Sequence, residues 1–365
     1  MTLQEIGKKI LVVGGYGNVG RIICTKLSQE FPGAVIAAGP DLAKAELLAY
    51  ETSDAVIPRQ LDVFNRNQIR DALEDVGLVI MCLDQTDTNF VEDCIRRGIH
   101  YIDITASYEF LSRVEDLHEK AKEDGATVIL SVGLAPGVTN LLASHAKTEF
   151  DTLEAVDIFV LLGLGEAHGK AAIRWSLEKM NAEYTVLEDG KIKAAHGFGQ
   201  RKKTTFPEGI GTRWAYSFDF SDQHVLPQTL GVRSAATWLT FDSALMTTFY
   251  AWLKQLGGFR LLDIEFVKDL FVRILGRVQV GSDQYVLQVD ANGEVNGEPR
   301  ASREALTGRN EGIGTALVAA QVAECLFTAT YPGGVFHIEQ LFEPLDFIRQ
   351  LQNADSSIHF VEERE

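Results

Sequence analysis

The sequence predicts an α/β protein that begins with a doubly wound parallel sheet and continues into a mixed α+β domain. Short apolar runs alternate with stretches of helical periodicity as far as Phe150, and a glycine-rich turn follows the first run. Strands and helices in such a series build parallel βαβ units. We expect residues 1–145 to form the first domain, residues 146–310 the second, and residues 311–365 a segment that returns to the first.

The elements expected in the first domain are short and closely spaced. Its strand-like runs are apolar, often β-branched, and bounded by glycine or polar residues, whereas its helical stretches carry apolar residues at a spacing of three or four. The strands are expected at residues 10–13, 34–38, 78–83, 101–104 and 127–132, and the helices at residues 20–30, 42–50, 90–97 and 110–124.

The second domain has a different pattern of strands and turns. Strands are expected at residues 155–162 and 183–187, and the Asp-Gly in 188–191 predicts a tight hairpin turn. A second hairpin is expected within residues 284–295, with its turn at 290–293. Helices are expected at residues 247–256, 263–275 and 312–328, and the polar tail from 356 to 365 is expected to fray.

Composition excludes several classes of protein. The chain of 365 residues has 34 Lys and Arg against 51 Asp and Glu, a net charge of −17, and has no basic block of the kind that binds nucleic acid. Four cysteines without CxxC spacing argue against a disulfide framework and a zinc site. The sequence shows neither a signal peptide nor an apolar run long enough for a membrane span. We therefore expect a cytoplasmic protein without a metal.

A glycine-rich loop follows the first expected strand and opens the first expected helix. Gly15 suits a tight turn, Gly17 a close approach of the backbone to a pyrophosphate, and Gly20 close packing of helix on strand. The helix N-terminus then offers unpaired N–H groups to phosphate. This context predicts a Rossmann-type dinucleotide site, whose loop consists of Gly15, Tyr16, Gly17, Asn18, Val19 and Gly20.

The end of the second expected strand leaves the choice between NAD and NADP open. An acidic residue there binds the ribose of NAD, whereas a nearby arginine accepts the extra phosphate of NADP. Asp41 lies at the expected distance from the glycine loop, but it follows Pro40 and also suits the cap of the next helix. Ala38 and Gly39 leave space for a phosphate, with Lys44 as the nearest cation.

Three motifs in order give the chain a family resemblance. The glycine loop, Gly98-Ile-His-Tyr-Ile-Asp103 and Gly133-Leu-Ala-Pro-Gly-Val-Thr-Asn140 resemble the saccharopine dehydrogenase-like family, most clearly over residues 8–145. The family includes saccharopine reductases, lysine 6-dehydrogenases and carboxynorspermidine synthases. The resemblance implies a Rossmann domain joined to an α+β domain for catalysis and homodimer formation. It also implies NAD(P)-dependent hydride transfer at a carbon–nitrogen bond of an amino acid or polyamine-like amine.

The resemblance also implies where the cofactor would lie. Besides the glycine loop, it places Asp62 and Val63 at the adenine, Cys82, Leu83 and Thr105 along the strand ends, and Gly133 and Pro136 at the nicotinamide. The chain departs from the family at two positions. Ala135 replaces an aspartate of the saccharopine reductases, and Pro40 replaces an arginine common in members that use NADPH.

Polar residues after two expected strands are candidates for catalysis. Asp103 is expected either to face a cationic amine, with Tyr101 as proton donor, or to cap the following helix while Tyr101 packs under the sheet. The helix start at Asn140 suits either an anionic substrate group or a simple cap.

The loop at residues 165–176 is a further candidate, because its polar residues directly follow a buried strand. His168 suits proton transfer and Arg174 suits a substrate carboxylate, although an exposed loop has the same composition. His196 and His224 are alternatives that are more often structural.

These features favour an oxidoreductase with a small amine or amino-acid substrate. Two alternatives remain open from the sequence: a Rossmann module that senses the NAD(P)H/NAD(P) ratio without turnover, and a redox-neutral transferase resembling homospermidine synthase.

Overall fold

The chain divides into two compact units. The computed structural model describes residues 1–165, 170–258, 265–275 and 281–364. The first unit comprises Met1–Gly137 and Gly312–Phe342, and the second comprises Val138–Glu311 and Glu343–Glu365. The C-terminal segment expected to return to the first domain therefore contributes to both units.

The first unit contains a parallel sheet of seven strands in the order β15-β6-β5-β4-β1-β2-β3. The order reverses at β1, because the chain adds β2 and β3 on one side and β4 to β6 on the other. This is the strand order of dinucleotide-binding folds, extended by β15, and it confirms the predicted fold class. The elements are β1 (Lys9–Val13), α1 (Asn18–Glu30), β2 (Val35–Gly39), α2 (Leu42–Glu51), β3 (Val56–Gln60), α3 (Arg66–Ala72), β4 (Val76–Met81), α4 (Asn89–Ile95), β5 (His100–Asp103), α5 (Tyr108–Glu115), α6 (His118–Glu123), β6 (Thr127–Leu130), α12 (Glu311–Thr328), β15 (Gly334–His337) and the short 3-10 helix η3 (Ile338–Gln340).

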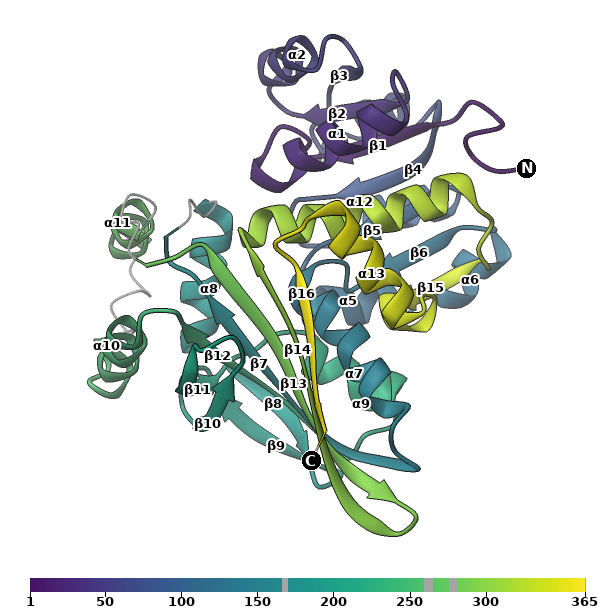
Figure 1. Cartoon of the computed structure of the whole chain (residues 1–365). Helices are drawn as coiled ribbons and strands as arrows, with labels where there is room; N and C mark the ends of the chain where they lie inside the picture. The colour runs from purple at the N-terminus through teal and green to yellow at the C-terminus, as the bar shows by residue number, and fades with distance from the viewer. Residues whose placement is uncertain (166–169, 259–264, 276–280, 365) are drawn as a thin grey trace. The chain divides into compact units, whose positions relative to one another are not determined.

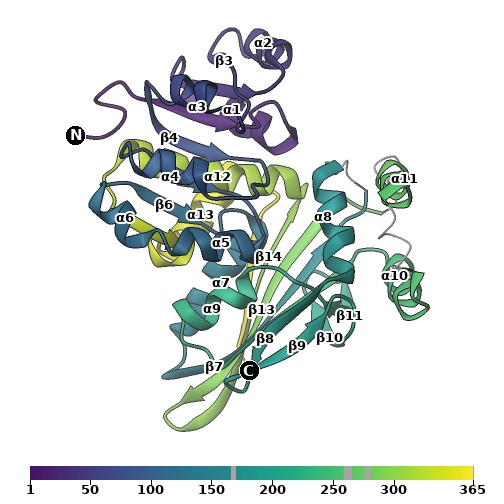
Figure 2. The same ribbon diagram turned by 180° about the vertical axis from the view of Figure 1, so that it is seen from behind.

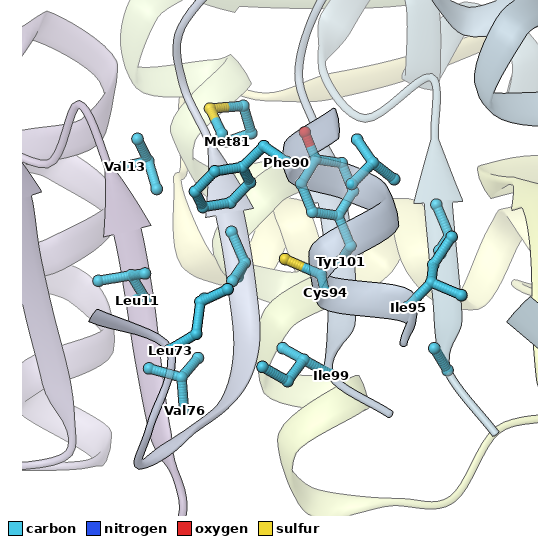
Figure 3. Packing of buried hydrophobic residues seen from close by; sticks show 14 of the residues in the cluster. Leu11, Val13, Leu73, Val76, Met81, Phe90, Cys94, Ile95, Ile99 and Tyr101 are labelled. Atoms are coloured by element: carbon cyan, nitrogen blue, oxygen red, sulfur yellow. The ribbon is translucent and has the colours of Figure 1, made fainter. Parts of the chain in front are cut away.

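Helices cover both faces of this sheet. Figures 1 and 2 show α1 and α12 on one face and α3, α4, α5 and α6 on the other. The second face buries a cluster that includes Leu11, Met81, Phe90 and Cys94. Figure 3 shows the Tyr101 ring within this cluster, with its hydroxyl toward the edge where β1 and β4 end. Burial on both faces explains why these strands are continuously apolar in sequence.

The second unit is built on a nine-stranded mixed sheet. Its main path is β10-β11-β12-β7-β13-β14-β16, and β8 pairs with both β12 and β9. Figures 1 and 2 show α7 and α9 on one side of this sheet. The elements are α7 (Thr139–Lys147), β7 (Thr152–Leu162), α8 (Lys170–Asn181), β8 (Glu183–Glu188), β9 (Lys191–His196), β10 (Arg201–Phe206), β11 (Gly211–Ser217), α9 (Asp222–Thr229), β12 (Ser234–Phe241), α10 (Ala244–Gln255), α11 (Glu265–Leu275), β13 (Gln284–Val295), β14 (Glu298–Arg309), α13 (Pro344–Ala354) and β16 (His359–Arg364). The segment η1 (Leu134–Val138), whose backbone angles are non-helical at Ala135, Pro136 and Gly137, lies at the passage from the first unit to the second.

The structure corrects two expectations in the second unit. Residues 290–293 are not a turn, because β13 runs unbroken from Gln284 to Val295 and pairs with both β7 and β14. The turn lies at Asn296 and Gly297, which have φ angles of 54° and 79° that suit a tight hairpin. The tail is also ordered by pairing, since β16 forms an antiparallel ladder with β14. None of the helices in the described part of the chain has the length and apolarity that crossing a membrane requires.

Candidate functional site

The glycine loop has the geometry that a bound phosphate requires. A Cβ on Gly15 would lie 2.8 Å from both the Val12 oxygen and the Ala37 Cα, and one on Gly20 would overlap the Gly14 carbonyl oxygen. Both glycines are therefore required for the close contact of loop, helix and strand. Gly17 N donates to the Gly14 oxygen at 2.8 Å, which closes the turn.

The N-terminus of α1 presents backbone donors without competing side chains. Its cap residue is Gly17, no side chain caps it, and its first turn has no acidic residue. The first helical bond runs from Arg21 N to the Gly17 oxygen, so the N–H groups of Asn18, Val19 and Gly20 precede the helical bonding pattern. A pyrophosphate suits this site because the donors and the helix dipole both favour a negative charge.

The residues around the end of β2 contact one another. Tyr16 lies against Gly39, where a Cβ would overlap the tyrosine hydroxyl, and that hydroxyl accepts a hydrogen bond of 2.9 Å from Asp41 N. The Asp41 side chain accepts from Lys44 N and pairs with Lys44 Nζ at 3.2 Å. Asp41 therefore caps α2 and is charge-balanced by Lys44, both of which lie at the sheet edge where a ribose would bind.

Residues named for the adenine and the strand ends also lie at this edge. Asp62 follows β3 and accepts a hydrogen bond of 3.0 Å from Phe64 N, while Val63 packs against the apolar cluster. Cys82 continues β4 through a bond of 3.0 Å from its N–H to the Val13 oxygen. The Leu83 side chain lies 3.0 Å from the position that a Cβ on Gly14 would occupy, and thus packs against the glycine loop.

A buried hydrogen-bonded cluster lies at the end of β5. Asp103 accepts from Tyr101 Oη at 2.7 Å and from Thr105 N at 2.8 Å, and the Tyr101 hydroxyl accepts from Gln85 Nε2 at 2.6 Å. Burial raises the pKa of Asp103 to about 7, although the hydrogen bonds from Tyr101 and Thr105 oppose this rise. Asp103 holds the turn before α5, whose N-cap is Ser107. The carboxyl is thus poised to hold or release a proton near neutral pH.

The segment after β6 is held by a series of side-chain hydrogen bonds that the sequence patterns did not reveal. Ser131, whose φ is 55°, has its hydroxyl 2.8 Å from His337 Nδ1, and His337 Nε2 lies 3.0 Å from Glu115 Oε1. A Cβ on Gly133 would lie 3.2 Å from the Pro136 oxygen, so this loop is closely folded on itself. His337 is 206 residues from Ser131, which explains why no local pattern indicated the pair.

The site residues expected in the second unit lie in separate surroundings. Asn140 is fully buried in α7, and the preceding Thr139 donates to Asp222 at 3.0 Å. Arg174 on α8 pairs with Glu265, with Asp269 at 2.9 Å and with Glu178 at 3.5 Å. These acidic partners occupy its guanidinium, and a role in substrate binding stays a prediction. His168 lies outside the described residues.

A charged cluster in the second unit joins residues that the sequence did not connect. Asp219 pairs with Lys179 Nζ at 2.5 Å and with His224 Nε2 at 2.7 Å, and all three side chains are largely buried. Burial alone would raise the pKa of Asp219, but hydrogen bonds from His224 and Lys179 outweigh it and lower the pKa. His224 thus pairs with Asp219, while His196 is largely exposed.

Comparisons with known proteins agree with these observations. The family model of the saccharopine dehydrogenase NADP binding domain matches residues 10–129. Over these residues the chain is similar to the saccharopine dehydrogenase-like family. It is 26% identical over 277 residues to carboxyaminopropylagmatine dehydrogenase of Synechocystis sp., covering 71% of this chain and 68% of that protein. It is 22% identical over 264 residues to carboxynorspermidine synthase of Vibrio cholerae serotype O1, covering 64% and 63%.

A solved structure supports the same fold for the whole chain. Apo saccharopine dehydrogenase (L-Glu forming) from Saccharomyces cerevisiae superposes with a TM-score of 0.71 at 17% identity, covering 98% of this chain and 100% of that one. The predicted family resemblance and fold class are confirmed, and the names of the relatives agree with the predicted oxidoreductase class. The roles of the individual site residues and the choice of dinucleotide stay predictions.

Proposed function

We propose that this protein catalyses NAD(P)-dependent hydride transfer at a carbon–nitrogen bond of a small amine or amino acid in the cytoplasm. One observation carries the proposal: an uncapped helix N-terminus and a glycine loop without room for side chains lie where the strand order reverses. That position is where doubly wound sheets bind dinucleotides. The names of the two curated relatives support a polyamine-like amine as the substrate class.

Each group of the first unit has a distinct role in this proposal. The N–H groups of α1 bind the pyrophosphate, and Leu83, Thr105, Gly133 and Pro136 border the path of the dinucleotide along the strand ends. The bound dinucleotide supplies the hydride chemistry. Tyr101 and Asp103 are buried, so we assign them a positioning role, in which they hold a proton and fix the turn at Thr105.

The end of β2 favours NADP(H) over NAD(H). The Asp41 carboxylate is balanced by Lys44, and Gly39 has no side chain to contact a ribose diol. Lys44 Nζ lies 6.0 Å from the centre of the Tyr16 ring, so a cation and an aromatic face lie together at this edge. A phosphate on the ribose suits these groups better than a bare hydroxyl does. The description of the matching family model as an NADP binding domain supports the same choice.

We also propose that the protein is a homodimer formed through α10 and α11. Leu245, Phe249 and Trp252 recur at helical spacing along α10 and are exposed, as are Leu256 directly after this helix and Phe266 and Leu270 of α11. An exposed apolar stripe of this kind marks an interaction surface. Light scattering on a size-exclusion column should give twice the monomer mass, and Phe249→Ser with Trp252→Ser should shift it to the monomer. A monomeric wild type would contradict this assignment.

The decisive experiment for the activity is nicotinamide absorbance with both cofactors, in both directions, at equal protein concentration. The panel contains lysine, saccharopine, diamines, agmatine and 2-amino acids, and oxoacids paired with ammonia or amines. We expect a substrate-dependent change with an amine or with an oxoacid–amine pair. Arg174→Ala tests the substrate clamp, because unchanged KM and kcat would exclude it.

A matched variant shows whether a change in absorbance comes from this site. Gly20→Ala should abolish it, since the loop can no longer hold the dinucleotide. A wild-type protein that binds the cofactor but gives no change with any amine would contradict the proposed oxidoreductase. That outcome would favour a cofactor sensor or a redox-neutral transferase.

A further inference from the structure

Three carboxylates converge on one face of the second unit's sheet. Glu304 lies on β14, Glu362 on β16, and Glu149 directly after α7. Each offers one oxygen, and these oxygens all lie within 4.8 Å of one another. The three residues are distant in sequence and do not belong to any motif of the dinucleotide site.

Repulsion makes this arrangement costly unless a cation balances it. Glu304 and Glu362 occupy directly opposite positions in the antiparallel ladder of β14 and β16. Like charges at such positions destabilise a sheet. Glu304 is also fully buried, whereas ionised carboxylates in protein interiors are ordinarily paired or bound to a metal. Its Oε1 lies 2.8 Å from His145 Nδ1, which orients the carboxylate and, when protonated, balances only one of the three negative charges.

Two buried polar atoms beside the cluster have no hydrogen-bond partner among the described residues. One is Glu304 Oε2, the second oxygen of the buried carboxylate. The other is the hydroxyl of Ser302, a residue that is 4% exposed. Ser302 lies two positions before Glu304 in β14 and therefore on the same face of the strand. Buried polar atoms normally have a partner, so both point to a ligand at this face.

We propose that Glu149, Glu304 and Glu362 bind a hard divalent cation such as Ca²⁺ or Mn²⁺. Carboxylate and hydroxyl oxygens are the ligands that these ions prefer. Calcium–oxygen bonds of about 2.3–2.6 Å place oxygens on opposite sides of the ion roughly 4.6–5.2 Å apart, so these three carboxylates can reach one ion. His145 holds Glu304 from outside, as hydrogen-bond donors commonly hold metal-binding carboxylates. The ion would tie the C-terminal strand to β14 and to the end of α7.

Calorimetric titration of the chelator-treated, full-length protein with CaCl₂, and separately with MnCl₂, tests this site. We expect one saturable site per chain and a higher Tm with the bound ion. Glu362→Gln should weaken binding at least about tenfold, because the site loses one of its three charges. Glu362 is exposed, so this variant should fold.

The neighbouring Glu363→Gln is the matched control. Glu363 precedes Arg364 on the same strand but pairs with Arg303, away from the cluster, at 3.7 Å. Glu363→Gln removes the same charge as Glu362→Gln does, but it should leave the affinity for the cation unchanged. The proposal is overturned if neither cation gives a saturable site in the wild type, or if Glu362→Gln and Glu363→Gln bind with equal affinity. Because the readout is cation binding, this result is independent of any dehydrogenase activity.

Discussion

The polar groups of the two units are assembled in different ways. In the first unit the groups at the expected dinucleotide site follow strand ends within a few residues, namely Tyr16 after β1, Asp41 after β2, and Thr105 after β5, and the contact of Ser131 with the distant His337 is an exception. In the second unit they come from distant segments, since Lys179 and Asp219 are 40 residues apart and His145 and Glu304 are 159 apart. The first arrangement is local to each strand, and the second depends on which strands become neighbours.

Strand direction explains this difference. In a parallel sheet every strand ends at the same edge, so each polar residue after a strand joins one site. In a mixed sheet the ends alternate, and residues meet through the register of the ladder or through the packing of helices near the sheet. Dinucleotide binding by the first unit should therefore be sensitive to substitutions that change the local backbone. The stability of the second unit should be sensitive to the loss of a single partner that is distant in sequence.

The largest effect is expected for Gly20→Ala in the first unit. A methyl group there overlaps the Gly14 carbonyl oxygen and should displace the loop, weakening dinucleotide affinity at least about 100-fold. Fluorescence titration with NADPH measures this affinity. Gly33→Ala is the control: its φ of 72° makes the change cost about 1 kcal/mol in stability, but no atom lies within 4 Å and cofactor affinity should persist. Equal affinity in both variants would contradict the assigned role of the loop.

Asp103→Asn should change how stability depends on pH. The pKa of Asp103 is raised from 3.8 to about 7, so between these values the folded protein keeps a proton that the unfolded chain releases. The free energy of unfolding therefore falls as pH rises through this window, by up to about 4 kcal/mol for about three pH units. The Asp103→Asn variant has no carboxyl group at this position, so its free energy of unfolding lacks this dependence on pH.

Urea unfolding at about pH 4 and about pH 8 measures the effect, with Asp116→Asn as a surface control in the same unit. The difference in stability between Asp103→Asn and wild type should grow in favour of the variant as pH rises. A difference that is independent of pH would show that Asp103 is not the group that titrates.

Asp219→Asn tests the second unit, where one substitution leaves the largely buried side chains of Lys179 and His224 without their carboxylate partner. We expect a loss of about 2–3 kcal/mol in the free energy of unfolding at neutral pH. Because the pKa of Asp219 is lowered, its contribution is present above the unfolded value of 3.8 and is lost as pH falls through the folded value. Lys202→Met is the comparison, because its pair with Asp157 is more exposed and should contribute less than about 1 kcal/mol. Equal losses would contradict the argument from burial.

The smallest effect is expected for Lys44→Ala, which concerns only the choice of cofactor. Loss of a surface cation should raise KM for NADP(H) by about tenfold and leave KM for NAD(H) nearly unchanged. Steady-state kinetics with both cofactors measure the ratio, and Lys26→Ala on α1 is the control. An equal rise for both cofactors would exclude Lys44 as the group that recognises the extra phosphate.

The sequence predicted most of the first unit and less of the second. The five expected strands there correspond to β1, β2, β4, β5 and β6. It missed β3, because Pro58 and Arg59 interrupt its apolar pattern, which an edge strand tolerates. In the second unit it placed a turn inside β13 and overlooked β14, because Asp-x-Asn-Gly is typical of turns and only pairing on both sides keeps it extended. It overlooked β16 because the tail is polar, and pairing with β14 orders it.

By itself, the sequence determined the order of βαβ units, the glycine loop and the residues that follow each parallel strand. These depend on periodicity, on glycine where side chains have no room, and on chain direction, all of which are local properties. Only the tertiary structure decided that His337 holds Ser131, that Lys179 and His224 share Asp219, and that Glu304 faces Glu362. The first contact arises from β15 joining β6 and the last from the antiparallel register of β14 and β16, whereas the Asp219 cluster joins α8, α9 and the segment between β11 and α9. All three are set by the packing of segments far apart in the chain, which local patterns do not encode.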